Sequence, residues 1–205
     1  MSVKLTKMEL RDQQYKLGQL KKYLPTLQLK KAMLQTEVNQ AIYEIEGLTK
    51  EYHAKYEECQ TFQALLSDPE SALVEEGSRV EEVEKRYENI AGADIPTFEK
   101  VRFRSIDYSL YETPLWIDSA IAKLRDLVIA KQKIEVVKEK KRILEKELRE
   151  VSIRVNLFEK VLIPKAEGNI KKIKVFLGDQ ELASVAQAKV AKGKIIKRKE
   201  KEDAA

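Results

Sequence analysis

The sequence contains few of the residues that interrupt long helices. Its 205 residues include seven glycines and five prolines, and aromatic residues make up only 7% of the chain. The scarcity of glycine and proline argues against a turn-rich fold, and the scarcity of aromatic side chains argues against a large globular core. The single cysteine, Cys59, excludes a disulfide within one chain and suits a reducing compartment. Because 36% of the residues are charged, long solvated helices are the expected structure.

The sequence also lacks a candidate membrane-spanning segment. It has no run of roughly eighteen apolar residues, and residues 1–9 lack the apolar core of a signal peptide. We therefore expect no direct membrane insertion and a cytoplasmic location.

Combinations of side chains typical of catalytic or cofactor sites are missing as well. There is no Gly-x4-Gly-Lys-Ser/Thr loop to hold phosphates. The only histidine, His53, lies beside Glu51, which is more typical of a helix surface than of a base or a metal ligand. Glutamates crowd residues 75–84, but without histidines or a calcium-loop pattern they do not indicate a metal site. We expect no catalytic residue, no cofactor and no metal.

The most informative stretch that is present lies near the C-terminus. Apolar residues recur there at steps of three or four, which places them on one face of a helix: Leu144, Leu148, Val151, Val155, Phe158, Leu162, Ala166, Ile170, Ile173 and Leu177. The residues between them are mostly charged. A stripe this narrow on a helix this long is typical of a coiled-coil seam that needs a partner helix.

A matching stripe occupies the N-terminal part of the chain. Thr6 and Glu9 form a capping-box pattern that predicts a helix start. One heptad register then connects Leu10, Leu17, Leu20, Leu24, Leu27, Leu34, Val38, Ala41, Ile45, Leu48, Tyr52, Cys59, Phe62 and Leu66, with interruptions at Gln13, Lys31 and Lys55. Pro25 is expected to bend or break this helix, which should end near Ser67-Asp68-Pro69.

The middle of the chain has a different pattern. Val74, Val80, Val83 and Tyr87 have helical spacing, and residues 90–96 are rich in turn formers. Residues 101–104 and 108–111 alternate in a way that predicts a short hairpin. Thr113-Pro114 should open the second long helix, with Trp116 packed where it meets the middle region. Within that helix we expect a bend at Pro164 and a break or fray at Gly178.

These patterns predict a mainly all-α fold: a long antiparallel two-helix coiled-coil hairpin with a small mixed insertion. The expected regions are residues 1–66 (long helix), 67–115 (globular insertion with a helix and a possible β-hairpin) and 116–205 (long helix and basic tail). A parallel homodimer of each helix is the alternative. The three regions have formal net charges of +2, −6 and +9, which suggests different partners at the two ends.

Residues 154–165, RVNLFEKVLIPK, resemble the signature of the D-subunit family of V-type and archaeal-type rotary ATPases, which reads Arg-Val-Asn-x-Leu-Glu and then Ile-Pro. The matching residues are Arg154, Asn156, Glu159, Ile163 and Pro164. Residues 6–10, 29–31 and 89–96 are similar to further motifs of the family, so the resemblance covers nearly the whole chain.

The resemblance implies a central-stalk rotor shaft, a non-catalytic subunit that couples ATP hydrolysis or synthesis to ion transport. Implied partners are the nucleotide-binding A and B subunits, the small F subunit of the stalk and a membrane-rotor docking subunit, in a complex peripheral to the membrane. Expected contacts with the catalytic head are Met8, Arg11, Lys189, Lys192, Lys194 and Lys197, with Met8 and Arg11 approaching residues 187–199. Expected contacts with the small stalk subunit are Tyr87, Ile95, Phe103 and Tyr108.

Two other functions share some of these features. A coiled-coil scaffold or tether would show the same heptads, although not the combined signature. A nucleic-acid-binding hairpin would use the basic tail, but that tail lacks interleaved aromatic residues, so we expect no nucleic-acid partner.

Overall fold

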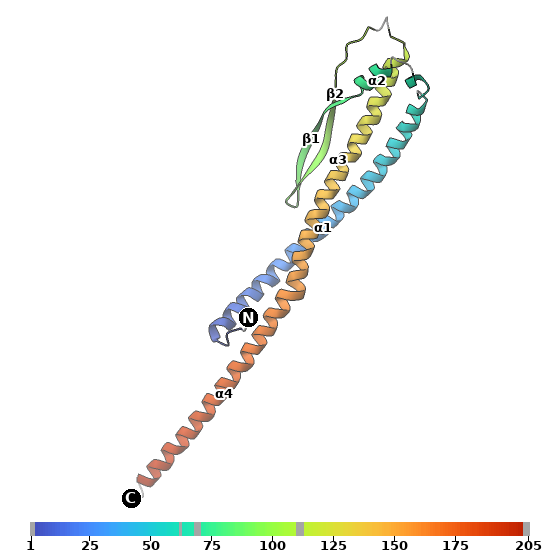
Figure 1. Ribbon diagram of the computed structural model, residues 1–205. Coiled ribbons are helices and arrows are strands. Elements are labelled where there is room, and N and C mark those ends of the chain that lie inside the picture. Colours follow the sequence, from blue (N-terminus) through green and yellow to red (C-terminus); the bar gives the residue numbers. More distant parts are fainter. Residues whose placement is uncertain (1–2, 62, 68–70, 110–112, 203–205) are drawn as a thin grey trace. The chain divides into compact units, whose positions relative to one another are not determined.

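The computed structural model describes residues 3–61, 63–67, 71–109 and 113–202 (Figure 1). The elements in chain order are α1 (Lys7–Gln60), a 3-10 turn (Leu65–Ser67), α2 (Ser71–Gly77), β1 (Val80–Ile90), β2 (Ala93–Phe103), α3 (Trp116–Leu157), a π-helical turn (Phe158–Leu162) and α4 (Ile163–Glu202). Two long helical segments with a small β-sheet between them confirm the predicted fold class. The chain divides into two compact units, Met1–Gln28 with Ile153–Ala205, and Leu29–Ser152.

In the first unit, the start of α1 runs antiparallel to α4. Lys21 Nζ lies 2.7 Å from Glu167 Oε1, and Lys7 Nζ lies 3.5 Å from Glu181 Oε1, so residue numbers rise on one helix as they fall on the other. Both ion pairs are exposed and contribute little to stability. The apolar seam contributes more: Val155, Ala166 and Ile173 are buried, and the leucines of α1 that face them are half-buried.

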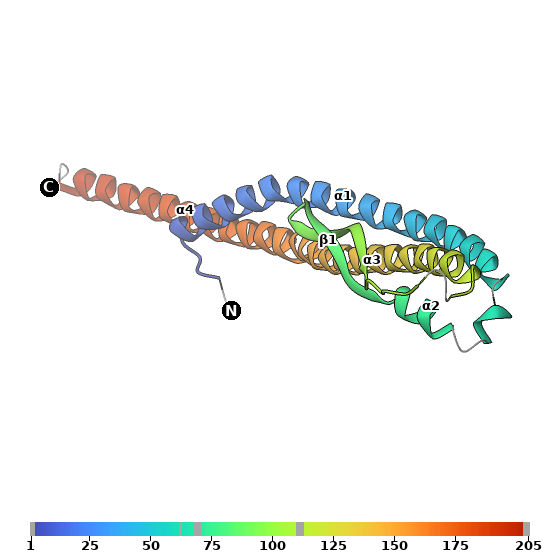
Figure 2. The same cartoon turned by 90° about the horizontal axis from the view of Figure 1, so that it is seen from above.

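In the second unit, the later part of α1 runs antiparallel to α3. Lys140 Nζ lies 3.3 Å from Glu44 Oε2, and Lys123 forms an ion pair with Glu58. The helix core consists of Leu34, Val38, Ala41, Ala130, Ile134, Val137 and Leu144, all buried. Figure 2 shows the two helices side by side, with the β-hairpin lying along them.

The predicted register of the C-terminal stripe is confirmed, and that of the N-terminal stripe is confirmed up to Cys59; Leu66, which lies beyond the end of α1, is exposed and does not continue it. All ten residues of the C-terminal stripe are buried or half-buried, and so are the described α1 stripe residues up to Cys59. Even the polar interruptions Gln13, Lys31 and Lys55 are half-buried, because their positions keep them on the seam. The antiparallel pairing within one chain covers both stripes, which leaves a parallel homodimer without support.

The boundaries of α1 agree with the sequence at one end only. The backbone N–H of Glu9 donates to Thr6 Oγ1 at 3.2 Å, which confirms Thr6 as the N-cap. The helix continues through Pro25 without a break and ends at Gln60, earlier than expected. Stripe residue Phe62 and the stop signal at Asp68 and Pro69 lie outside the described residues.

The C-terminal helix also differs from expectation in two places. Gly178 causes no break, because α4 continues to Glu202. Near Pro164 the chain forms a π-helical turn, in which Ile163 N–H donates to the carbonyl oxygen of Phe158, five residues back. Proline has no N–H and its ring crowds the carbonyl four residues before it, and a wider turn relieves that crowding.

The insertion contains a β-hairpin, but not where the sequence indicated. Strands β1 and β2 pair antiparallel, from Val80 opposite Phe103 to Ile90 opposite Ala93. The predicted helical segment at residues 80–87 is therefore wrong, and so is a strand beginning at Tyr108; Leu110 and Tyr111 lie outside the described residues. Ala91 and Gly92 make the turn with φ values of 52° and 82°, as a two-residue hairpin turn requires.

A small hydrophobic cluster joins α2 to the start of α3. It is built from the buried residues Val74, Ile117, Ala120 and Ile121, with Trp116 and Ile106 packed against them. Trp116 thus packs where it was expected to. Gly77 is required by close packing, since an added Cβ would lie 2.8 Å from Ile106 Cδ1.

The antiparallel seam of the first unit predicts a disulfide within one chain. With Cys59 replaced by serine, the pair Leu17→Cys and Ile173→Cys should oxidise intramolecularly, because both side chains lie on the seam. Tyr15→Cys with Ile173→Cys is the control, since Tyr15 points to solvent. Mobility on non-reducing gels separates the outcomes, and a product formed only between chains would contradict the hairpin.

Candidate partner-binding surfaces

The basic end of α4 lies beyond the part of the helix that α1 covers. The first turn of α1 reaches only as far as Glu181, through Lys7. Every residue from 181 to 197 is exposed. The expectation that Met8 and Arg11 approach residues 187–199 is therefore wrong: both side chains are exposed, but they sit opposite an earlier part of α4.

Four lysines of this uncovered end were expected to contact a partner: Lys189, Lys192, Lys194 and Lys197. At 3.6 residues per turn they do not line one face but are spread around the helix. Exposed apolar residues lie before and between them, including Leu182, Val185, Val190 and Ile195. Such a surface suits many weak contacts rather than one specific pocket.

The signature residues surround the π-helical turn. Arg154, Asn156, Glu159 and Pro164 are exposed, and Ile163 is half-buried. The motif thus combines a helix irregularity with polar side chains at the surface. π-helical turns often occur at functional positions, and this one places Phe158 and Leu162 on the seam.

The four residues expected to contact the small stalk subunit have different surroundings. Tyr87 is 64% exposed on β1, whereas Ile95 on β2 is only 1% exposed and is covered by the chain itself. The guanidinium of Arg125 lies 5.2 Å from the centre of the Phe103 ring. Tyr108 O–H donates to the Asp118 carboxylate, which raises the pKa of the phenol. Of the four, Tyr87 presents the most surface to a partner.

The far end of the α1–α3 pair contains the cysteine. The Cys59 thiol donates to the carbonyl oxygen of Lys123 at 3.6 Å, and removal from water raises its pKa. The hydrogen bond and the charge of Lys123 lower the pKa of the Glu58 carboxyl beside it. His53 is exposed, with its ring edge against Tyr52. These are the features of a packed thiol and a surface histidine rather than of a reactive pair.

Three glutamates of the insertion, Glu76, Glu82 and Glu84, form ion pairs with arginines. Arg102 contacts Glu82, at 3.5 Å, and Glu84, while Arg104 Nη1 lies 3.4 Å from Glu76 Oε1. Within the described ranges, no group of three or more histidine, cysteine or acidic side chains is arranged to hold a metal ion.

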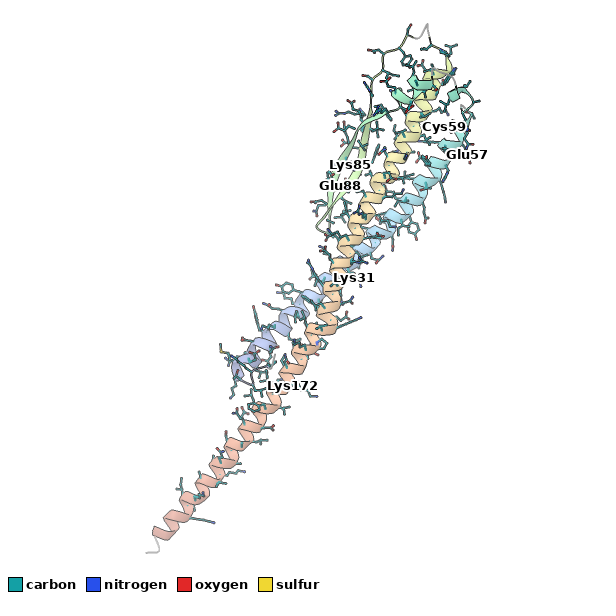
Figure 3. The ribbon with its side chains drawn as sticks, viewed as in Figure 1. Lys31, Glu57, Cys59, Lys85, Glu88 and Lys172 are labelled. Carbon is teal, nitrogen blue, oxygen red and sulfur yellow. The ribbon has the colours of Figure 1, made fainter. Side chains whose placement is uncertain are left out.

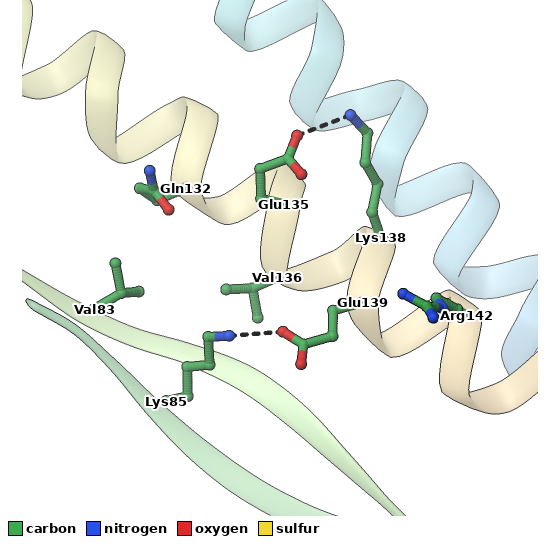
Figure 4. A pocket seen from close by; sticks show the side chains of 8 residues that line it. All are labelled: Val83, Lys85, Gln132, Glu135, Val136, Lys138, Glu139 and Arg142. Atoms are coloured by element: carbon green, nitrogen blue, oxygen red, sulfur yellow. Dashed lines mark hydrogen bonds and ion pairs between the residues drawn. The ribbon is translucent and has the colours of Figure 1, made fainter.

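A cleft between β1 and α3, which the sequence did not indicate, completes the candidate surfaces (Figure 4). Its volume is about 630 Å³, and we call it the β1–α3 cleft. The residues lining it are Val83 and Lys85 of β1 and Gln132, Glu135, Val136, Lys138, Glu139 and Arg142 of α3. No sequence signal could have revealed it, because it depends on where the hairpin packs.

Comparison with known proteins decides the family. The family model described as the ATP synthase D subunit matches residues 9–193. The chain belongs to this family. The resemblance carried by residues 154–165 is therefore confirmed.

Relatives in several species cover the full chain. The V-type ATP synthase D subunit of Chlamydia caviae is 47% identical over 204 residues, which is 99% of this chain and 98% of the relative. The proteins of the same description from Chlamydia abortus and Chlamydia pneumoniae are 46% and 45% identical, over 99% and 98% of this chain and 98% and 97% of their own lengths.

Membership in the D-subunit family makes this chain a central-stalk component of a rotary V-type ATP synthase and a non-catalytic subunit of that enzyme complex. A free-standing scaffold and a nucleic-acid-binding hairpin gain no support from these matches. None of the helices in the described part of the chain has a stretch long and apolar enough to cross a membrane.

Proposed function

We propose that this chain is the rotor shaft that couples ATP hydrolysis or synthesis in a catalytic head to ion transport by a membrane rotor. The observation that carries the proposal is the antiparallel helix pairing within each unit, on a chain that matches the D-subunit family over residues 9–193. A shaft must resist twisting, and a close-packed seam along paired helices provides that stiffness.

The uncovered basic end of α4 is the proposed contact with the nucleotide-binding A and B subunits. Lys189, Lys192, Lys194 and Lys197 can meet carboxylates of the head from several directions, because they are spread around the helix. A rotating shaft must leave each subunit for the next, so weak distributed contacts suit the task better than one tight pair. Met8 and Arg11, exposed on the first two turns of α1, belong to the same proposed contact.

The insertion is the proposed site for the small F subunit of the stalk and for the membrane-rotor docking subunit. Its acidic character distinguishes it from the basic end of α4, as expected for a surface with different partners. Tyr87 and the hairpin around it offer an exposed surface, whereas Ile95 and Phe103 would support that surface from below. The chain would supply no catalytic residue or cofactor and would act on the cytoplasmic side, peripheral to the membrane.

Purification from the native membrane tests the assignment directly. A tag on this chain should recover nucleotide-binding subunits and a small stalk subunit in constant proportion. Recovery of the chain without any ATPase subunit would favour the scaffold alternative. Binding to nucleic acid that disappears at modest salt, without a protein partner, would favour the other alternative.

Replacing residues 72–111 by a short Gly-Ser linker should separate the two contacts. The helix pairs should remain folded, because none of their seam residues lies in the insertion. Binding of the small stalk subunit should be lost, as measured by co-purification of the two subunits. If binding persisted, the contact would lie on the helices instead.

A further inference from the structure

One edge of the hairpin, the outer side of β1, receives no backbone hydrogen bond from the rest of the described residues. In a two-residue hairpin, the residues flanking the turn exchange both backbone hydrogen bonds, and such pairs alternate with pairs that exchange none. Ile90 and Ala93 flank the turn, so Glu88 and Arg86 also bond to β2, whereas Tyr87 and Lys85 do not. The backbone N–H and C=O groups of Tyr87 and Lys85 therefore point outward, away from β2.

Proline provides a check on this assignment. Pro96, which lacks an N–H, is the partner of Tyr87. Proline is tolerated there because, by the alternation, this position of β2 forms no backbone hydrogen bond with β1. Among the described residues, no backbone group outside β2 bonds to β1. The outer edge of β1 is thus open.

One face of the hairpin packs on the helices. Lys133 Nζ of α3 lies 5.7 Å from the centre of the Phe98 ring, Lys85 of β1 pairs with Glu139 of α3, and Pro96 is buried. Beside β1 lies the β1–α3 cleft, in which Val83 of the strand and Val136 of the helix are the apolar lining residues (Figure 4). An edge strand beside a helix-lined cleft is the arrangement that accepts an added strand.

Charge identifies what the cleft would bind. Lys85 Nζ lies 2.6 Å from Glu139 Oε2, and Lys138 Nζ lies 3.0 Å from Glu135 Oε1, so four of its charged groups are paired. Arg142 is exposed and has no ion-pair partner among the described residues. An incoming segment would meet a guanidinium, which favours a carboxylate.

A second copy of this chain is a poor occupant. Strand β1 carries four glutamates against one lysine and one arginine, and Figure 3 shows Lys85 and Glu88 on it. Pairing β1 with another β1 would bring two strands of the same net negative charge together, which is unfavourable.

We propose that the open edge of β1 and the adjoining surface of α3 bind an extended segment of the small stalk subunit, which adds to the hairpin as a third strand and places a carboxylate against Arg142. This inference rests on the proposed contact between the insertion and that subunit. It specifies that backbone hydrogen bonds from β1 make the contact, and that the side chains of β1 contribute less to the binding affinity.

The test measures binding of the full-length chain to the purified small stalk subunit by calorimetry. Tyr87→Pro removes an outward N–H without removing a bond to β2, and it should weaken binding roughly tenfold or more. Tyr87→Val keeps the N–H and should bind within about twofold of the unchanged chain. Arg142→Ala should also weaken binding roughly tenfold, whereas Arg149→Ala, an exposed residue of α3 outside the cleft, should not.

The outcomes separate the inference from the proposed function. If the unchanged chain did not bind the small subunit at all, the proposed function of the insertion would be wrong. If it bound and Tyr87→Val weakened binding as much as Tyr87→Pro, recognition would be through the side chain and strand addition would be overturned. Equal binding by Arg142→Ala and Arg149→Ala would overturn the carboxylate contact. This comparison of two arginine variants holds even if Tyr87→Pro fails to fold.

Amide hydrogen exchange gives an independent readout. Strand addition should slow exchange at Lys85 and Tyr87 only in the complex, because those N–H groups are free in the isolated chain. Arg86 and Glu88 already bond to β2 and should change less. Uniform protection along β1, or none, would contradict an added strand.

Discussion

Val155→Asp is expected to lower the free energy of unfolding of the first unit by about 3 kcal/mol or more. Val155 is only 3% exposed and lies near the end of α3, on the seam with α1. An aspartate there would either remain charged without a partner or be protonated at a cost in free energy. Urea denaturation followed by circular dichroism measures the effect.

Ile153→Asp is the matched control. Ile153 lies two residues away on the same helix but is 60% exposed, on the opposite face. The same substitution there should change the free energy of unfolding by about 0.5 kcal/mol or less. Equal effects at the two positions would mean that the seam does not stabilise the helix pair.

The contrast between a buried and an exposed face of one helix also explains why the helices could be predicted from the sequence. The ten stripe residues from Leu144 to Leu177 are all buried or half-buried, because their spacing alone determines which face of a helix they share. The breaks allowed for at Pro25 and Gly178 do not occur, because α1 and α4 continue through them. A proline costs about 3 kcal/mol inside a helix, and the seam on either side of Pro25 outweighs that cost. A glycine costs only about 1 kcal/mol, which does not interrupt α4 at Gly178.

The hairpin could not be placed from the sequence, for a specific reason. Val80, Val83, Tyr87 and Ile90 are spaced like one face of a helix. In the structure, β1 has irregular register between Val80 and Glu82 and between Glu84 and Lys85. The first leaves Glu81 as an extra residue in β1 and the second leaves Glu99 as an extra residue in β2, so neither strand keeps a simple period of two. The helical spacing in β1 does not mark one buried face, since Tyr87 is 64% exposed.

The candidate surfaces were predicted unevenly. The exposed lysines of α4 and Tyr87 could be chosen from charge and exposure patterns, and they are at the surface. Ile95 could not be distinguished from them, because its burial depends on the hairpin packing against α3. The β1–α3 cleft combines Lys85 and Arg142, which are far apart in sequence, and only the folded chain brings them together.

Deletion of residues 189–205 is expected to reduce coupling between ATP hydrolysis and ion transport while leaving the helix pair folded. The described part of this segment is exposed and contributes nothing to the seam, so the free energy of unfolding should change by less than about 1 kcal/mol. Six basic groups between Lys189 and Lys199 are lost together. At about 0–1 kcal/mol for each exposed pair, their combined loss should weaken the contact with the head on the order of tenfold or more.

Ion pumping per ATP hydrolysed, measured on the assembled complex in vesicles, reports the coupling. Lys194→Ala is the control, because a distributed contact should lose almost nothing when one exposed charge is removed. Both variants should assemble, since neither change touches the seam or the insertion. If Lys194→Ala alone stopped ATP turnover in the assembled complex, that lysine would make a specific contact, and the end of α4 would not act as a distributed bearing surface.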